Sequence, residues 1–443
     1  GTDGTNGTNG TNGADGVGGV RDFVASGTLP NGQAVILKAD GTVETVSNAL
    51  PESIPAGSYQ QWTDTNGNPI ESYKLAFDPN NQNQFLLTYY GPAGYGAIRV
   101  CTISGTTITF GAEVIFNSES TSARHIEFAP NNSGTFIISY RKSNYSGTVK
   151  VGTLSGSTLS FGTENQYTGG TSVVASCGFD PADNNKFVVL YSYWPAGGHA
   201  RCRVGTISGT SVSYGAEITV SSGDCNYGQL SFISSGIFVA GYNRGASGGF
   251  VRAGAISGTS VTFGTEVMIA PNYSGGKVQI DADPLNVGSF IVMHNGHVTS
   301  GNKYYGGCRA GTISGTTITL GAENQFFAPH NSNGVLGLSI QFSGATIGAF
   351  VMQYGHDWDN KAKVRTGSVT NNVITYGSEI EIFSSSDSND SHIAFTSNGK
   401  FVAVFKPSTG YARAYVGQMA GTGTSNLTSL SYVGISSAAY TDS

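Results

Sequence analysis

Charged residues are scarce in this chain of 443 residues, because Asp, Glu, Lys and Arg together make up 11% of it, against a usual share of about 25%. The net charge of −6 is small and acidic, so nucleic acid is not an expected partner. No apolar run approaches the roughly 20 residues of a membrane-spanning helix. The composition therefore predicts neither nucleic-acid binding nor membrane insertion.

Cysteine pairs and motifs of catalysis are also missing. The five cysteines are an odd number and none has CxxC spacing, which predicts neither a disulfide framework nor a zinc site. Cys101, Cys202 and Cys308 recur near one position of a repeat, as small buried apolar residues do. No helical period, nucleophile elbow or phosphate loop is present, so we expect no cofactor. Residue 1 is Gly and no signal peptide is visible, which indicates a fragment of a longer protein.

Glycine, in contrast, is placed with strict regularity at the start. Residues 1–21 carry Gly at positions 1, 4, 7, 10, 13, 16 and 19. A collagen triple helix requires Gly at every third residue, because no other side chain fits at its axis. We interpret this segment as a collagen-like stalk, which predicts a homotrimer; the alternative is a flexible Gly-rich tether.

One pattern then returns seven times. It begins with an aromatic residue at intervals of 51, 51, 51, 52, 60 and 51 residues, at Phe85, Phe136, Phe187, Phe238, Phe290, Phe350 and Phe401. Four residues after each come Tyr89, Tyr140, Tyr191, Tyr242, His294, Tyr354 and Phe405. Val, Ile, Thr, Tyr and Phe dominate the segments around them, which is typical of strands. A period near 50 predicts an all-β fold, a seven-bladed β-propeller of four-stranded blades.

A basic residue and an acidic residue recur 14 positions apart. The pairs are Arg99 and Glu113, Lys150 and Glu164, Arg203 and Glu217, Arg252 and Glu266, Arg309 and Glu323, and Arg365 and Glu379. A hairpin between the third and fourth strands of each unit would place the two residues opposite each other, so we expect cross-strand ion pairs. Such a pair in every unit indicates scaffold rather than a binding site.

The seventh unit lacks this acid, because position 427, which is 14 residues after Arg413, is Leu. An open ring would leave a bare strand edge. We expect residues 33–48, which include Glu44, to supply the outer strand; the competing segment is 427–436. The predicted organisation is a stalk over 1–21, a linker with the ring-closing strand over 22–69, the propeller over 70–420, and a linker to a following module or tail over 421–443.

The combination of these segments resembles phage tail-fibre proteins, especially those of marine phages. The resemblance rests on the Gly-x-y triplets, FVASGTLPNGQAVILKADGTVETVSN, the low-charge β repeats and SNLTSLSYVGISSAAYTDS. It implies an extracellular, virion-associated fibre or appendage that attaches to a host cell and contacts other fibre modules. A bacterial surface adhesin is the alternative.

Candidate binding residues lie in the loops between the second and third strands, where a rigid scaffold presents variable side chains. All three tryptophans, Trp62 included, fall on one predicted face. Planar rings beside polar groups are typical of carbohydrate sites. The candidate ligand-binding residues are Trp194, Trp358, Tyr145, Tyr193, His199, Arg244, His297, Tyr304, Tyr305, His356, Asp357 and Tyr411.

Two further groups of residues give weaker hypotheses. Glu127 and Asp281 are the acids of a row expected to face the central channel, and two carboxylates are what a glycosidase needs. Asp64, Asn66 and Asn68 alternate oxygen ligands as a Ca²⁺ loop does, or form a polar turn. We favour a non-catalytic module that binds a host cell-surface receptor, a glycan or a protein. A purely structural fibre or decoration module and a propeller glycosidase or lyase are the alternatives.

Overall fold

The computed structural model describes residues 24–25, 35–37, 42–45, 60–64, 66–67, 73–130, 134–271, 277–298, 303–330, 335–356, 361–384, 391–405 and 412–419. The chain divides into two compact units, one of residues 1–49 with 420–443 and one of residues 50–419. The predicted stalk over 1–21 and the predicted tail over 421–443 lie outside the described residues. In the smaller unit β1 (Val24–Ala25) runs parallel to β3 (Thr42–Thr45), and β3 is antiparallel to β2 (Val35–Leu37).

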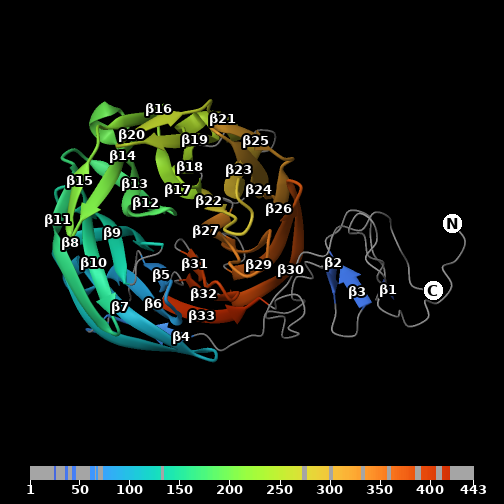
Figure 1. The fold of residues 1–443 in the computed structure, drawn as a ribbon, viewed down its shortest axis with the longest axis horizontal. Coiled ribbons are helices and arrows are strands. Elements are labelled where there is room, and N and C mark those ends of the chain that lie inside the picture. Colours follow the sequence, from blue (N-terminus) through green and yellow to red (C-terminus); the bar gives the residue numbers. More distant parts are fainter. Residues whose placement is uncertain are drawn as a thin grey trace, which may run out of the picture. The chain divides into compact units, whose positions relative to one another are not determined.

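The larger unit is a β-propeller, in which antiparallel sheets follow one another around a ring (Figure 1). The first two blades share one strand, β8 (Thr107–Phe128), whose first half pairs with β7 and whose second half pairs with β9. Together they form a sheet of β5 (Lys74–Asp78), β6 (Asn81–Tyr90), β7 (Tyr95–Ser104), β8, β9 (Thr135–Lys142), β10 (Gly147–Ser155) and β11 (Thr158–Thr168).

The next three blades have a fourth strand that is broken in two. The break follows a glycine such as Gly215 or Gly264, where an added Cβ would lie 2.1 or 2.0 Å from a backbone oxygen of the following blade. The strands are β12 (Ser172–Asp180), β13 (Asp183–Tyr193), β14 (His199–Ser208), β15 (Ser211–Tyr214) and β16 (Ile218–Asp224); then β17 (Asn226–Ser234), β18 (Ile237–Asn243), β19 (Gly249–Ser257), β20 (Ser260–Phe263) and β21 (Val267–Ala270); then β22 (Val278–Ala282), β23 (Ser289–Val298), β24 (Lys303–Ser314), β25 (Thr317–Leu320) and β26 (Asn324–His330).

The last two sheets have four strands each, and the final one joins the two ends of the ring. The first comprises β27 (Val335–Phe342), β28 (Ala349–His356), β29 (Lys361–Thr370) and β30 (Val373–Ser384). The second comprises β31 (Ser391–Phe395), β32 (Lys400–Phe405), β33 (Ala412–Gln418) and β4 (Gln60–Trp62). Three short 3-10 turns complete the described elements, η1 (Pro92–Gly94), η2 (Trp194–Ala196) and η3 (Gly245–Ser247). Each blade is named below by its innermost strand: β5, β8, β12, β17, β22, β27 or β31.

The strand that completes the β31 blade corrects two predictions. Strand β4 pairs with β33 in the register Arg413 opposite Gln61, whereas β2 and β3 of the segment 33–48 pair with each other. Trp62 is 4% exposed and stacks on Phe110 at 5.2 Å between ring centroids, so it is not a surface residue. The expectation failed because β4 is three residues long, too short to show a strand pattern in the sequence.

The aromatic residue that marks each repeat lies in the core. All of the marker phenylalanines from Phe85 to Phe401 are fully buried. In most blades the third strand places a glycine against this ring; at Gly205 an added Cβ would lie 2.3 Å from the ring of Phe187. The five cysteines are buried free thiols, and for Cys101, Cys202 and Cys308 the repeat position predicted this burial. Burial raises their pKa, to about 12 for Cys202, so these thiols are not reactive.

Candidate functional site

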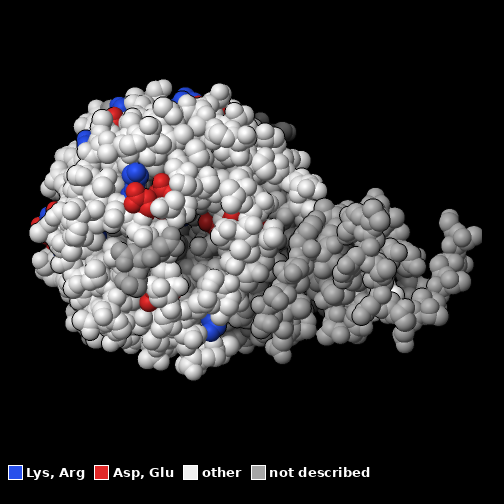
Figure 2. Space-filling model, viewed as in Figure 1, with Lys and Arg blue, Asp and Glu red and all other residues white. Residues whose placement is uncertain are grey.

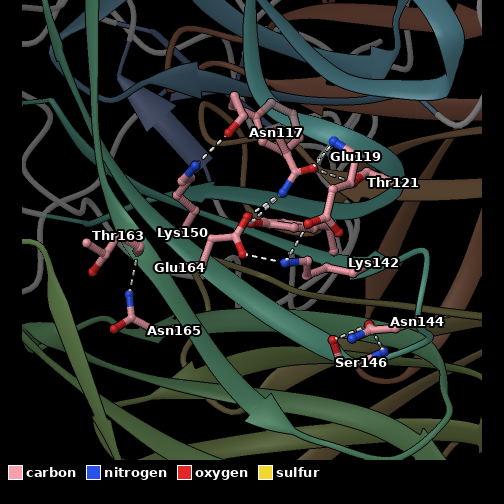
Figure 3. A network of polar contacts seen from close by, with 12 residues as sticks. Asn117, Glu119, Thr121, Lys142, Asn144, Ser146, Lys150, Thr163, Glu164 and Asn165 are labelled. Carbon is pink, nitrogen blue, oxygen red and sulfur yellow. Dashed lines mark hydrogen bonds and ion pairs between the residues drawn. The ribbon is translucent and has the colours of Figure 1, made fainter.

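Two exposed aromatic side chains lie on neighbouring blades. Tyr145, in the loop between β9 and β10, is 52% exposed, and Trp194, which begins η2, is 43% exposed. Tyr145 has a positive φ of 66°, held by a turn in which Asn144 Oδ1 accepts hydrogen bonds from Ser146 N at 3.0 Å and Ser146 Oγ at 2.7 Å (Figure 3). The guanidinium of Arg141 lies over the Tyr145 ring at 5.0 Å. We call Arg141, Tyr145, Tyr193 and Trp194 the aromatic patch.

The two loops of the aromatic patch are joined through one short connector. Ser172 N donates to Tyr145 O at 2.9 Å, and Trp194 N donates to Thr171 O at 3.0 Å. Within η2, Gly197 N donates to Trp194 O at 2.9 Å, with Gly197 in the left-handed region. These main-chain bonds fix the backbone at Tyr145 and Trp194, and both side chains are exposed to solvent.

A cavity of about 440 Å³ adjoins the patch between the β8 and β12 blades. Its volume falls in the range of roughly 300–1,000 Å³ that is usual for ligand sites. Tyr193 belongs to both the aromatic patch and the cavity wall. Its ring lies over Gly170, where an added Cβ would be 2.5 Å from the ring. The wall is mostly polar, and its residues are Gln166, Tyr167, Thr168, Gly169, Tyr193, Arg203 and Glu217. Sequence reasoning identified Tyr193 and missed the other six.

The recurring glutamates bind tyrosines rather than pairing simply with the basic residues. In the β5, β8, β12 and β17 blades the buried tyrosine hydroxyl donates to the glutamate, at 2.7, 2.9, 2.7 and 2.7 Å. The pairs are Tyr89 with Glu113, Tyr140 with Glu164, Tyr191 with Glu217 and Tyr242 with Glu266, and Tyr354 donates to Glu379 likewise. In the β22 blade His294 Nε2 lies 3.2 Å from Glu323, which also accepts from Tyr305 at 3.0 Å.

The expected cross-strand ion pairs are therefore corrected in part. The predicted register holds for Arg99 opposite Glu113, Lys150 opposite Glu164 and Arg365 opposite Glu379, and Arg99 lies 3.7 Å from Glu113. The basic side chains, these three included, donate to main-chain carbonyls. Arg252, for example, donates to Gly264 O at 2.8 Å and to Val220 O of the preceding blade at 2.6 Å. The hairpin geometry alone predicted the basic side chain as the partner of the carboxylate. In the structure the tyrosine hydroxyl donates to the carboxylate.

The glutamate of the β8 blade has a further partner that fills the space above it. Figure 3 shows Lys142, whose Nζ lies 2.8 Å from Glu164 and 3.3 Å from Glu119. Asn117 Nδ2 also donates to Glu164 from the neighbouring blade. In the β17 blade Arg244 occupies the position of Lys142 and lies 2.6 Å from Glu266. Tyr193 occupies this position in the β12 blade, so Glu217 faces the cavity instead.

The two channel acids serve as hydrogen-bond acceptors between inner strands. Glu127 Oε1 accepts from Phe179 N at 3.2 Å, and Asp281 Oδ2 accepts from Phe342 N at 2.7 Å. Burial raises the pKa of Asp281 to about 7, and the charges of Asp283 and Glu127 add to this rise. Other side chains of the inner strands make the same contact; Gln341 accepts from Phe395 N at 2.8 Å. Both carboxylates thus have a structural role that an uncharged acceptor fills equally well.

The other predicted site residues are dispersed. His199 is half-buried near Gly197, and His297 stacks on Tyr304 at 4.7 Å in the β23–β24 hairpin. Tyr305 is 5% exposed and bound to Glu323, which corrects its assignment to the surface. Arg244 pairs with Glu266, lies over the Phe250 ring at 5.0 Å and packs against Gly223 of the preceding blade, so these contacts occupy its side chain. His356 ends β28 with its side chain outside the described part, and Asp357, Trp358 and Tyr411 lie outside the described residues.

The weak calcium candidate forms a turn. Asp64 Oδ1 accepts from Asn66 N at 2.9 Å, and Asp64 O accepts from Gly67 N at 3.1 Å, while Asn68 lies outside the described residues. Within the described ranges no group of three or more His, Cys, Asp or Glu side chains is arranged to hold a metal ion. No helix in the described part of the chain is long and apolar enough to cross a membrane.

No protein-family model matches the chain, and no curated protein matches it in sequence. Among solved structures, the periplasmic gluconolactonase PpgL of Pseudomonas aeruginosa is similar with a TM-score of 0.51 and 13% identity, over 82% of this chain and 96% of that one. Saccharomyces cerevisiae Sqt1 has a TM-score of 0.48 and 11% identity, over 83% and 100%. Chaetomium thermophilum Raptor has a TM-score of 0.49 and 11% identity, over 82% and 29%. At such identities, the likeness to the gluconolactonase concerns the propeller fold alone.

Proposed function

We propose that this chain is a non-catalytic attachment module, a seven-bladed propeller carried behind a collagen-like stalk, which binds a host cell-surface receptor through the aromatic patch. The stalk would join three copies, and the resemblance to tail-fibre proteins supports a location on a virion surface among other fibre modules. The receptor class that best fits exposed rings is a glycan, because a planar ring packs against the C–H face of a sugar.

The observation that carries this proposal is the exposure of Tyr145 and Trp194 on loops fixed by main-chain hydrogen bonds. A large exposed ring on an ordered loop contributes contact area at little cost in conformational entropy. Figure 2 shows one face of the molecule, on which charged side chains are few and gather in small groups. The hydrogen-bonding role of Glu127 and Asp281 supports a non-catalytic channel.

The test is binding of the purified protein to whole cells and to a panel of cell-envelope glycans. We expect saturable binding that Trp194→Ala weakens at least tenfold, while the unfolding midpoint stays unchanged because the side chain is exposed. Val373→Ala is the matched control, since Val373 is 64% exposed at the β29–β30 turn, at the opposite ends of the strands from the patch loops. A folded protein that binds no cell and no glycan would instead be a structural module of the fibre.

A further inference from the structure

The cavity beside the aromatic patch exists because one residue position differs between neighbouring blades. The residue two positions after the glutamate-bound tyrosine is Lys142 in the β8 blade, Tyr193 in the β12 blade and Arg244 in the β17 blade. The positions are equivalent in space, because Arg244 lies against Gly223 as Tyr193 lies against Gly170. Lys142 and Arg244 each fold back onto the glutamate of their own blade. Tyr193 has no such charge, so the volume that a base from this position fills in the β8 and β17 blades is open, although Arg201 of β14 lies 3.9 Å from Glu217.

A second difference between neighbouring blades lies on the wall of the cavity opposite Tyr193. Asn117 in the β5–β8 connection donates to Glu164 of the next blade, which closes that side of the space. Fifty-one residues later the equivalent residue is Thr168, whose shorter side chain lines the cavity. Two substitutions on opposite walls therefore open the same space. An irregularity in one loop alone would not explain both substitutions.

The polar groups in this space have unused hydrogen-bonding capacity. Arg203 donates from Nη1 to Gly215 O at 3.2 Å, and its buried Nε has no hydrogen-bond partner among the described residues. Lys150, Arg252 and Arg365 reach a carbonyl of the preceding blade, whereas within the described part no such contact is found for Arg203 or Arg309. Because this Nε is shielded from solvent, a ligand in the cavity can reach the Arg203 guanidinium only through its Nη atoms.

We propose that this cavity binds one uncharged pyranose ring, as the terminal residue of the glycan to which the module attaches. Arg203 supplies donors and Glu217 supplies acceptors in the same cavity, and a sugar hydroxyl both donates and accepts. Arg203 and Glu217 are the charged residues of the lining, and Arg201 Nε lies 3.9 Å from Glu217 Oε1 outside the lining. A carboxylated sugar would meet Glu217, and an amino sugar cation would meet Arg203. Tyr193 provides the ring wall on which the C–H face of the sugar packs. This inference rests on the proposed attachment function and names its ligand class.

The experiment is saturation-transfer NMR on the full chain with methyl glycosides of neutral hexoses and of N-acetylhexosamines, and with a uronic acid as the charged comparison. We expect transfer to at least one neutral glycoside and none to the uronic acid. Tyr193→Arg should abolish the transfer, because the new base would pair with Glu217 as Arg244 pairs with Glu266. Thr168→Asn tests the opposite wall without altering the patch, and we expect at least a fivefold weaker binding.

Val373→Ala is the control for binding, and the unfolding midpoint of each variant is the control for folding. If Tyr193→Arg and Thr168→Asn both fold and bind glycosides and cells as the wild type does, the cavity is not a sugar site. Loss of cell binding in Trp194→Ala alone would then leave the attachment function standing without this pocket. Transfer to neutral glycosides with no binding to any cell would support the pocket and contradict the attachment function. Stronger binding of the uronic acid would overturn the assignment to an uncharged ring.

Discussion

Asp281 has the most clearly perturbed carboxyl group of the inner strands, since burial raises its pKa to about 7. An unfolded aspartate titrates near pH 3.9. Between these two values the folded protein binds more protons than the unfolded chain, so the contribution of Asp281 to stability falls as the pH rises. The contribution is fully present below about pH 4 and is lost as the pH passes through about 7.

Asp281→Asn tests this linkage, because the amide oxygen can still accept the hydrogen bond from Phe342 N. We expect the variant and the wild type to unfold at similar temperatures near pH 4, and the variant to unfold several degrees higher near pH 8. Differential scanning calorimetry across this range measures both. A variant that loses stability equally at every pH would show that the carboxylate is needed in its charged form.

The basic and acidic residues 14 positions apart show what a sequence spacing can determine. The spacing predicted the hairpin register correctly for Arg99, Lys150 and Arg365, because register follows from counting residues across a turn. It did not predict which group contacts the carboxylate. That choice depends on the neighbouring strand, where Tyr89 and its counterparts direct a hydroxyl to the glutamate. Phe405 fits the same rule, since its repeat has neither a hydrogen-bonding side chain at the tyrosine position nor the acid, whereas His294 and Glu323 occupy these positions together.

At the scale of elements, strand β4 joins the end of the ring to its beginning. Its Trp62 is buried, stacks on Phe110 and meets Tyr73 edge-on at 6.2 Å between ring centroids. Trp62→Ala removes these contacts, and we expect it to lower the free energy of unfolding by about 3–5 kcal/mol. Denaturant titration measures this change. Trp194→Ala is the matched control because it removes an exposed tryptophan. A similar loss of unfolding free energy in both variants would contradict the distinction between the buried Trp62 and the exposed Trp194.

A pair of N-terminal deletions tests strand β4 without a point substitution. Removing residues 1–49 leaves β4 intact, so the propeller should keep its unfolding midpoint. Removing residues 1–63 also removes β4 and leaves one edge of β33 unpaired. We expect a lower midpoint and a tendency to aggregate in the longer deletion, as seen by light scattering. Equal midpoints would show that β4 contributes nothing to ring closure.

The strands of the repeats and the loops that carry Tyr145 and Trp194 were predictable, and the cavity was not. Buried markers such as Phe187 recur because each blade needs the same core, which leaves a period in the sequence. The aromatic patch and the cavity arise from departures from that period, at Thr168 and Tyr193. Trp62 and Trp194 looked alike in sequence, and their different burial follows from long-range packing that no local pattern records. The cavity wall also combines two blades whose contributing residues lie far apart along the chain.

At the scale of the whole molecule, the strict glycine period over 1–21 predicts three copies of the chain. Light scattering after size exclusion should give about three times the 45.8 kDa chain mass for the full chain. Deleting residues 1–21 should give a monomer that still binds glycan, with weaker attachment to cells because three linked sites bind more tightly than one. A monomeric full-length chain would contradict the triple-helix interpretation and favour a flexible tether.

The most direct test of the account is competition for host cells. Labelled wild-type protein is bound to cells and displaced with unlabelled wild type, Trp194→Ala or Val373→Ala, after all three have been shown to be folded. The account predicts that wild type and Val373→Ala displace the label equally, while Trp194→Ala requires at least a tenfold higher concentration. Equal displacement by all three proteins would contradict the claim that the aromatic patch is the attachment surface.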